Sequence, residues 1–112
     1  MIGFRRGDVV LVAFVFADES GSKMRPALVL SSAPYHRSRR EAIVAAVTSN
    51  VERRLAGDHL LKGWRAAGLL FPSVVTGILR TIQQGMIRRR LGSLSMPDLE
   101  AVESELRSSL DL

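Results

Sequence analysis

Four short apolar runs, several of them rich in β-branched residues, and a fifth run expected to carry its charges outward constrain the fold more than any other feature. Such runs are typical of β-strands, because branched side chains pack well on a pleated sheet. They are residues 8–16 (DVVLVAFVF), 26–32 (PALVLSS), 42–50 (AIVAAVTSN), 73–82 (SVVTGILRTI) and 85–94 (GMIRRRLGSL). The pattern predicts about five to seven short strands in a mainly β (α+β) fold, arranged as a small, mostly antiparallel barrel.

The segments between these runs are predicted to be connections. Residues 17–23 (ADESGSK) are rich in turn formers and are expected to form an exposed loop. Pro26 is expected to open the second strand, since proline is tolerated at a strand's first residue, where its missing N–H is not yet needed. Residues 33–41 (APYHRSRRE) are interpreted as a polar, basic connection. Residues 51–72 leave open a short strand after a turn, followed by a packed loop.

The end of the chain changes to a helical pattern. Ser95 stands three residues before Asp98, which is close to a capping box and predicts a helix start. Acidic residues in the first turns favour this helix through its dipole. Apolar residues then recur at helical spacing, which predicts a stripe packed on the barrel: Met96, Leu99, Val102, Leu106 and Leu110.

Length and composition indicate one domain that spans residues 1–112. The chain has no cysteine, which excludes disulfides and thiolate metal sites and is compatible with a reducing cytoplasm. The two histidines, His36 and His59, make a histidine-rich metal centre implausible. No apolar run approaches the roughly 18 residues of a membrane span, and the N-terminus lacks the pattern of a signal peptide. We therefore expect a cytoplasmic protein.

Charge is distributed unevenly along the chain. Residues 98–112 carry five acidic residues and one basic residue, whereas the remaining chain carries 15 basic and 6 acidic residues. Of the 16 basic residues, 14 are arginine, whose planar fork suits phosphate. The basic body favours an anionic partner such as nucleic acid. The clusters Arg37/Arg39/Arg40 and Arg88–Arg90 are interpreted first as solvated surface, with contacts to RNA or to an acidic protein segment as the alternative.

The order and spacing of five segments resemble the PemK/MazF family, toxins of bacterial type II toxin–antitoxin pairs. These segments are RRGDVVLVAF at 5–14, RPALVLS at 25–31, AAVTSN at 45–50, PSVV at 72–75 and RRRLGSL at 88–94. The resemblance implies an SH3-like antiparallel barrel of the CcdB/PemK toxin type with a C-terminal helix. It also implies a homodimer, a cognate antitoxin that blocks the site, and sequence-selective cleavage of single-stranded RNA (an mRNA interferase) that needs no metal or other cofactor.

Carried over position by position, the resemblance assigns catalytic roles to Arg25 and Thr48. Attack by the substrate's own 2′-hydroxyl needs the extra negative charge on phosphorus neutralised and the leaving oxygen stabilised. An arginine supplies charge and a two-pronged hydrogen bond, and a threonine hydroxyl donates one more. Lys23, Ser49 and Arg80 are predicted to contact the RNA through phosphate or ribose.

The sequence departs from the family pattern where a general base is concerned. Family members commonly carry an arginine and an acidic residue shortly after the SVV segment, and some carry a histidine in the first loop. Here the corresponding stretch is residues 76–79 (TGIL), and the first loop offers only Asp18 and Glu19. The base is therefore left open among Asp18, Glu19, a water molecule and, less favoured, His36.

Two alternative functions remain compatible with the sequence. One is a non-enzymatic toxin that binds DNA gyrase, as CcdB proteins do through their C-terminal helix, which would place function on residues 96–112. The other is a decayed family member that binds RNA or an antitoxin without cutting. The joint presence of Arg25 and Thr48 in family order favours the ribonuclease.

Overall fold

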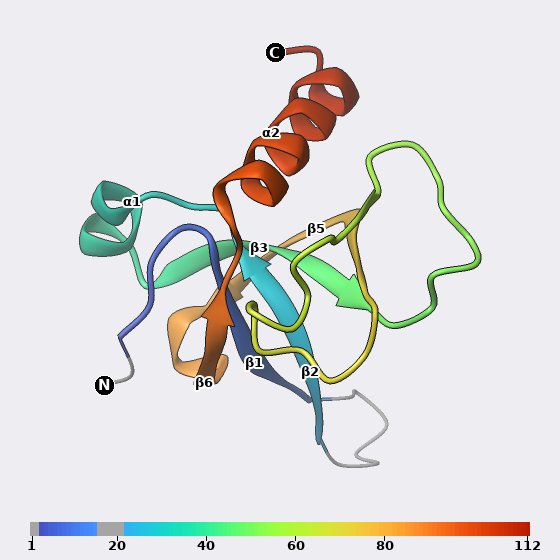
Figure 1. The fold of residues 1–112 in the computed structure, drawn as a ribbon. Coiled ribbons are helices and arrows are strands. Elements are labelled where there is room, and N and C mark those ends of the chain that lie inside the picture. Colours follow the sequence, from blue (N-terminus) through green and yellow to red (C-terminus); the bar gives the residue numbers. More distant parts are fainter. Residues whose placement is uncertain (1–2, 16–21) are drawn as a thin grey trace.

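A computed structural model describes residues 3–15 and 22–112 of the chain, and Figure 1 shows how its elements are arranged. The strands are β1 (Asp8–Val15), β2 (Ser22–Val29), β3 (Glu41–Thr48), β4 (His59–Leu60), β5 (Val74–Gln83) and β6 (Ile87–Ser93). The helices are α1 (Ala33–Ser38), the 3₁₀ turn η1 (Gln84–Met86) and α2 (Met96–Leu110). None of these helices is both long enough and apolar enough to span a bilayer.

The six strands form one antiparallel sheet in the order β4-β5-β3-β2-β1-β6. This result confirms the predicted mainly antiparallel β fold with a C-terminal helix. Figure 1 shows β1, β2 and β6 running at a steep angle to β3 and β5, so the sheet is strongly coiled. Coiling of this kind follows from the right-handed twist that every strand carries.

Two sets of buried apolar side chains lie on opposite faces of the sheet, because successive residues of a strand point to opposite sides. On β1, Val9 belongs to one set, whereas Val10 and Val12 belong to the other. The set beneath α2, here called the helix-side core, is Val9, Leu28, Ala45, Val47, Leu61, Ala67, Val75, Leu94 and Val102. The second set, here called the concave core, is Val10, Val12, Ala27, Val29, Val44, Ile82 and Ile87.

The predicted start of the second strand was wrong. Pro26 lies inside β2 and pairs with Leu11 of β1. Its missing N–H is tolerated because β2 pairs with β3 only over Ala27–Val29. At Pro26 the strand therefore has a sheet neighbour on one side alone, which is the edge-like position where proline is accepted.

The segment interpreted as a polar connection contains a helix, α1. Ser32 caps its N-terminus by accepting a hydrogen bond from the Tyr35 amide, and a proline occupies the first turn. The side-chain nitrogen of Gln84 lies 3.0–3.1 Å from the carbonyl oxygens of His36, Arg39 and Glu41, which share its two N–H groups. A helix of six residues is too short to persist alone, so these contacts hold it in place.

Helix α2 begins as predicted, with the Ser95 hydroxyl accepting from the Asp98 amide at 3.3 Å. Leu99, Val102 and Leu106 pack against the helix-side core, as the predicted stripe requires. The two ends of that stripe were predicted wrongly, since Met96 is 65% exposed and Leu110 is 52% exposed. Leu110 is in the last turn of α2, and Figure 1 shows this end of the helix extending past the sheet. Met96 is the first residue of the helix.

The long segment between β3 and β5 contains only the two-residue strand β4, and residues 61–73 form the packed loop that the sequence left open. Leu61 and Ala67 anchor this loop in the helix-side core. Gly68 has φ +82°, and a Cβ atom there would lie 2.1 Å from the Leu91 carbonyl oxygen. Only glycine fits this approach of the loop to β6, which brings residues 69–71 beside the strand ends.

Candidate active site

Arg25 and Thr48 face each other where β2 and β3 separate. Ala27 and Ala46 are the last pair of the β2–β3 ladder toward that end. Continuing the same antiparallel register beyond them sets residue 25 opposite residue 48. Both residues line two neighbouring hollows of about 410 Å³ and 360 Å³, with Pro26 and Val47 between them. The structure thus brings the two predicted catalytic residues together, although they are 23 positions apart in the sequence.

The Arg25 side chain is exposed at the mouth of these hollows. By alternation along β2 it lies on the same face as Ala27 and Val29, which belong to the concave core. Across residues 3–15 and 22–112, no ion pair or hydrogen bond involves its guanidinium group. Its five N–H donors are therefore open to a ligand such as a phosphate group.

The Thr48 side chain is half-buried and held by the turn that follows β3. Its Oγ1 accepts a hydrogen bond from the Asn50 amide at 3.1 Å. That contact uses an acceptor site of the hydroxyl and leaves its hydrogen for donation to another group. The geometry suits a donor that points into the hollow beside Arg25.

The larger hollow combines arginines with apolar surface. Ser49 and Arg89 line it together with Arg25. On the loop side, Leu70 is 82% exposed and Phe71 is 64% exposed, which is unusual for side chains of this size. Ser49 could be predicted from the sequence, whereas the contribution of the 69–71 loop could not, because a loop without secondary structure gives no periodic signal.

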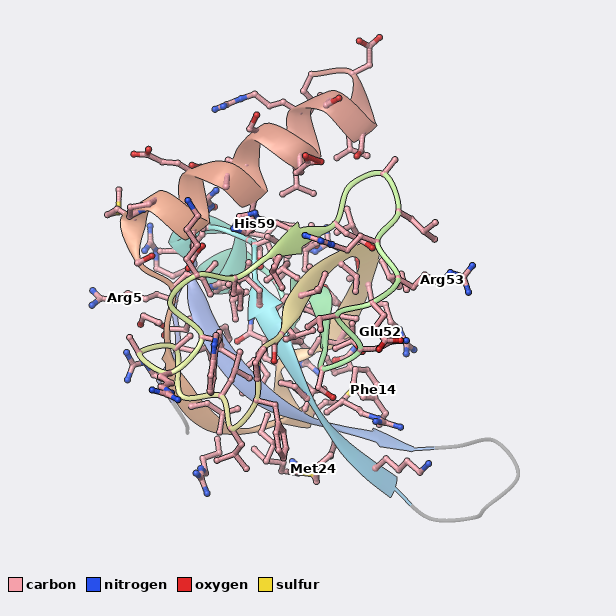
Figure 2. All side chains as sticks on the ribbon, turned by 45° about the vertical axis from the view of Figure 1, so that its right-hand side comes forward. Arg5, Phe14, Met24, Glu52, Arg53 and His59 are labelled. Carbon is pink, nitrogen blue, oxygen red and sulfur yellow. The ribbon has the colours of Figure 1, made fainter. Side chains whose placement is uncertain are left out.

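The smaller hollow opens onto the concave core. Arg80 and Ile78 of β5 form one side of it and Phe14 of β1 the other. The Arg80 guanidinium carbon lies 4.8 Å from the centroid of the Phe14 ring, although β3 and β2 separate these strands in the sheet. This contact shows that the sheet curls so that β1 and β5 approach each other on the side of the concave core. Figure 2 shows Phe14 near the C-terminal end of β1.

Lys23 is the predicted RNA contact that the structure leaves outside both hollows. It is exposed on β2, opposite Phe14 of β1. The structure therefore assembles four of the five predicted site residues, Arg25, Thr48, Ser49 and Arg80. It adds Phe14 and Arg89, whose side chains the sequence alone could not place because their position depends on the curl of the sheet.

The two basic clusters separate in the structure. Arg37, Arg39 and Arg40 are exposed around α1, and the Arg39 Nε donates to Glu41 at 3.0 Å, a contact that raises the arginine pKa. On β6, Arg90 pairs with the buried Asp8 at 3.2 Å, and Arg88 donates to the Gly85 carbonyl. Of the arginines in these two clusters, which all lie in the described part of the chain, Arg89 is the one that lines a hollow.

No described residue that lines the two hollows is acidic or a histidine. Asp18 and Glu19 lie outside the described residues. Asp58 approaches the stretch where the family acid is missing, since its Oδ1 accepts from the Gly77 amide at 2.8 Å. Its Oδ2 accepts from the Leu55 amide at 2.9 Å, so both oxygens hold the backbone of the 55–58 turn against β5.

His36 lies in α1 and away from both hollows. Its Nε2 is 2.6 Å from the Ser31 Oγ, and its ring packs edge-on against Phe4 at 4.9 Å. Burial lowers its pKa from the ordinary histidine value, because the charged form loses solvation. Its place in the fold is therefore that of a packing residue.

His59 lies beneath α2 (Figure 2) and pairs with Asp98 of that helix, and neither residue lines a hollow. The His59 Nε2 lies 2.9 Å from one oxygen of Asp98, which is 2% exposed. Asp98 also accepts from the amides of Lys62 at 3.1 Å and Gly63 at 2.9 Å. Burial raises the Asp98 pKa, but the hydrogen bonds from His59 and the two amides outweigh it and leave this pKa below its ordinary value.

Comparison with known proteins supports the resemblance noted in the sequence. The model of a family described as PemK-like, MazF-like toxin of type II toxin–antitoxin systems matches residues 5–110. The chain therefore belongs to this family, which confirms the relationship inferred from the five sequence segments. No match was found among curated proteins.

Solved structures of MazF toxins share the fold over nearly the whole chain. A chain of the MazE–MazF structure (Form-III) from Deinococcus radiodurans superposes with a TM-score of 0.80 at 22% identity, and the match covers 97% of this chain and 97% of that chain. The Mycobacterium tuberculosis toxin MazF-mt6 gives 0.76 at 25% identity, with 94% of this chain and 97% of that chain covered. An endoribonuclease in complex with its cognate antitoxin, from a mycobacterial species, gives 0.76 at 16% identity and covers 98% and 97%.

Proposed function

We propose that this protein is the toxin of a type II toxin–antitoxin pair and acts as a metal-independent, sequence-selective endoribonuclease on single-stranded RNA. The observation that carries the proposal is the unpaired guanidinium of Arg25 opposite the Thr48 hydroxyl, at the mouth of two open hollows. Family membership supports it, and one structural relative is named an endoribonuclease.

The reaction assigned to this site is an intramolecular transesterification, in which the phosphorus of the RNA backbone passes from the 5′-oxygen to the 2′-oxygen. The 2′-oxygen attacks the adjacent phosphorus, the bond to the 5′-oxygen breaks, and the products are a 2′,3′-cyclic phosphate and a 5′-hydroxyl. Arg25 binds the phosphate oxygens and stabilises the negative charge that grows on them. Thr48 donates a hydrogen bond to the same group. The 2′-hydroxyl loses one proton and the leaving 5′-oxygen gains one, so the protons balance, and no described residue that lines the hollows is assigned to either transfer.

The proposal includes two protein partners, a cognate antitoxin and a second copy of the chain. Relatives from Deinococcus radiodurans and from a mycobacterial species were crystallised with MazE or with a cognate antitoxin. In this chain, Leu70 and Phe71 present apolar surface beside Arg25 and Arg89. Such a combination suits a protein segment with acidic and apolar residues, which would cover the site and keep RNA out.

The test of this proposal is incubation of purified, antitoxin-free protein with a long unstructured RNA in excess EDTA. We expect discrete fragments that end in 2′,3′-cyclic phosphate. Arg25→Ala and Thr48→Ala should each lower the cleavage rate by about 100- to 1,000-fold, as loss of a transition-state donor does in other enzymes. Both residues are at the surface or half-buried, so the variants should keep the fold, which circular dichroism would verify.

Arg107→Ala is the matched control, because Arg107 is an exposed arginine on α2 that lines neither hollow. Its cleavage rate should equal that of the wild type. Intact RNA over a broad pH range, from wild-type protein that still arrests cell growth, would reject the nuclease and direct attention to a protein target of α2.

A further inference from the structure

The smaller hollow differs from a simple phosphate site in its shape and lining. It has a volume of about 360 Å³, within the size of pockets that hold small organic groups. Its floor is apolar and formed by Ala27, Val44 and Ala46, next to the concave core. An apolar pocket adjoining Arg25 suits a planar, weakly hydrated group that is linked to the phosphate through the ribose, which in RNA is a nucleobase.

Arg80 forms one wall of this hollow, and among the described residues its guanidinium group contacts an aromatic ring instead of an acidic side chain. Its guanidinium carbon lies over the Phe14 ring, 4.8 Å from the ring centroid, in a cation–π contact. In the described part of the chain, no acidic side chain pairs with it. The contact places the arginine but consumes none of its N–H donors, so these are available at the wall of the hollow.

The polar side chains that line the hollow are donors. Arg25 and Arg80 carry no acceptor, and the Thr48 hydroxyl, which uses one of its two lone pairs for the Asn50 amide, keeps its hydrogen for donation. The described lining residues therefore offer no carboxylate or side-chain amide that could accept a hydrogen bond from an exocyclic amino group. Arginine is also the side chain that pairs best with the carbonyl-bearing edge of guanine.

From these contacts we infer that the smaller hollow is a base-recognition subsite that selects guanine or uracil over adenine or cytosine. Guanine and uracil carry a carbonyl oxygen where adenine and cytosine carry an amino group. The selected nucleotide lies next to the cleaved bond, because the hollow shares Arg25 and Thr48 with the site of cleavage. The inference rests on the proposed function, since it takes single-stranded RNA as the ligand.

The test uses binding, so that it does not depend on cleavage. Short fluorescent oligonucleotides of uridine or of cytidine, with 2′-fluoro groups in place of the nucleophile, would be titrated with the full-length protein. Fluorescence anisotropy should give a dissociation constant about tenfold lower for the uridine oligomer, within the discrimination that one well-placed base contact provides. Both oligomers have the same backbone charge, so the ratio reports the base alone.

Arg80→Gln should bring the ratio of the two dissociation constants close to one, because glutamine offers both a donor and an acceptor to a base. Arg80→Met provides a second route to the same loss, since it keeps the apolar stem and removes every donor. Arg107→Gln should leave the ratio unchanged. Equal affinities in the wild type, or a preference that survives both Arg80 substitutions, would overturn the subsite.

The binding result and the cleavage result separate the two proposals. A protein that prefers the uridine oligomer but leaves RNA intact would keep the subsite and reject the nuclease. A protein that cleaves RNA but binds both oligomers equally would keep the nuclease and reject the subsite. Sequencing of the fragment ends should then show guanine or uracil at one position beside the cut.

Discussion

At the scale of single residues, the buried carboxylate of Asp98 accepts more hydrogen bonds than any other acidic side chain described on α2. Its two oxygens form hydrogen bonds of 3.3 Å or less with His59, two loop amides and the Ser95 hydroxyl. Asp98→Asn should lower the free energy of unfolding at pH 7 by about 2–3 kcal/mol, because an amide cannot accept all these donors. Urea denaturation would measure the loss, with Glu100→Gln, an exposed neighbour on the same helix, as the control.

The same residue predicts an acid dependence of the stability. Because its pKa in the folded protein lies below the ordinary value of 3.8, the unfolded chain binds the proton more readily. The stabilisation is therefore complete above about pH 4 and is lost as the pH falls through the lower, folded pKa. A pH series of unfolding curves should show a shallower acid limb for Asp98→Asn; an unchanged limb would assign the effect to other carboxyl groups.

At the scale of elements, the strands and α2 could be predicted because their signals are local. β-branched runs give β1, β3 and β5, and a serine cap followed by apolar spacing gives α2. Helix α1 was missed because its six residues carry no buried side chain and thus no apolar period. The Ser32 cap and the proline after it were the available signals, and a basic run obscured them.

Helix α1 depends on Gln84 of η1, which reaches three carbonyl oxygens at its C-terminal end. Gln84→Ala should expose those carbonyls and lower the stability by about 1 kcal/mol, the value of a typical hydrogen bond. Hydrogen exchange should speed up at the His36 and Arg39 amides and stay slow in β1 and β3. Gln83→Ala, a change at an exposed neighbour, should not alter exchange in α1; equal acceleration throughout the sheet would mean that α1 does not open by itself.

At the scale of the whole molecule, the candidate site exists only because the sheet curls. The family pattern in the sequence was sufficient to predict Arg25 and Thr48 as site residues. It could not supply the Phe14–Arg80 contact, which joins strands that are not neighbours in the sheet. Nor could it show that residues 69–71 border the larger hollow, since that depends on the glycine contact between the loop and β6.

Charge is also arranged at this scale. Helix α2, which carries the acidic residues, projects on the side of the sheet away from the C-terminal end of β1 and the N-terminal end of β2 (Figure 1), and Glu103 pairs with Arg6 at 2.5 Å. Three arginines without acidic partners in the described chain line the hollows: Arg25, Arg80 and Arg89. An RNA strand that crosses both hollows can therefore contact up to three guanidinium groups without meeting the acidic helix.

The number of these contacts predicts the salt dependence of RNA binding. For single-stranded nucleic acid, each neutralised phosphate contributes about 0.7 to the slope of log affinity against log salt concentration. Arg80 is assigned to the base, so phosphate contacts by Arg25 and Arg89 give a slope of about 1.4. Arg89→Gln should reduce the slope by about 0.7 and weaken uridine and cytidine oligomers equally, because a phosphate contact carries no base information. Arg107→Gln should leave the slope unchanged. A slope that Arg89→Gln does not alter would mean that the bound strand passes the smaller hollow without entering the larger one.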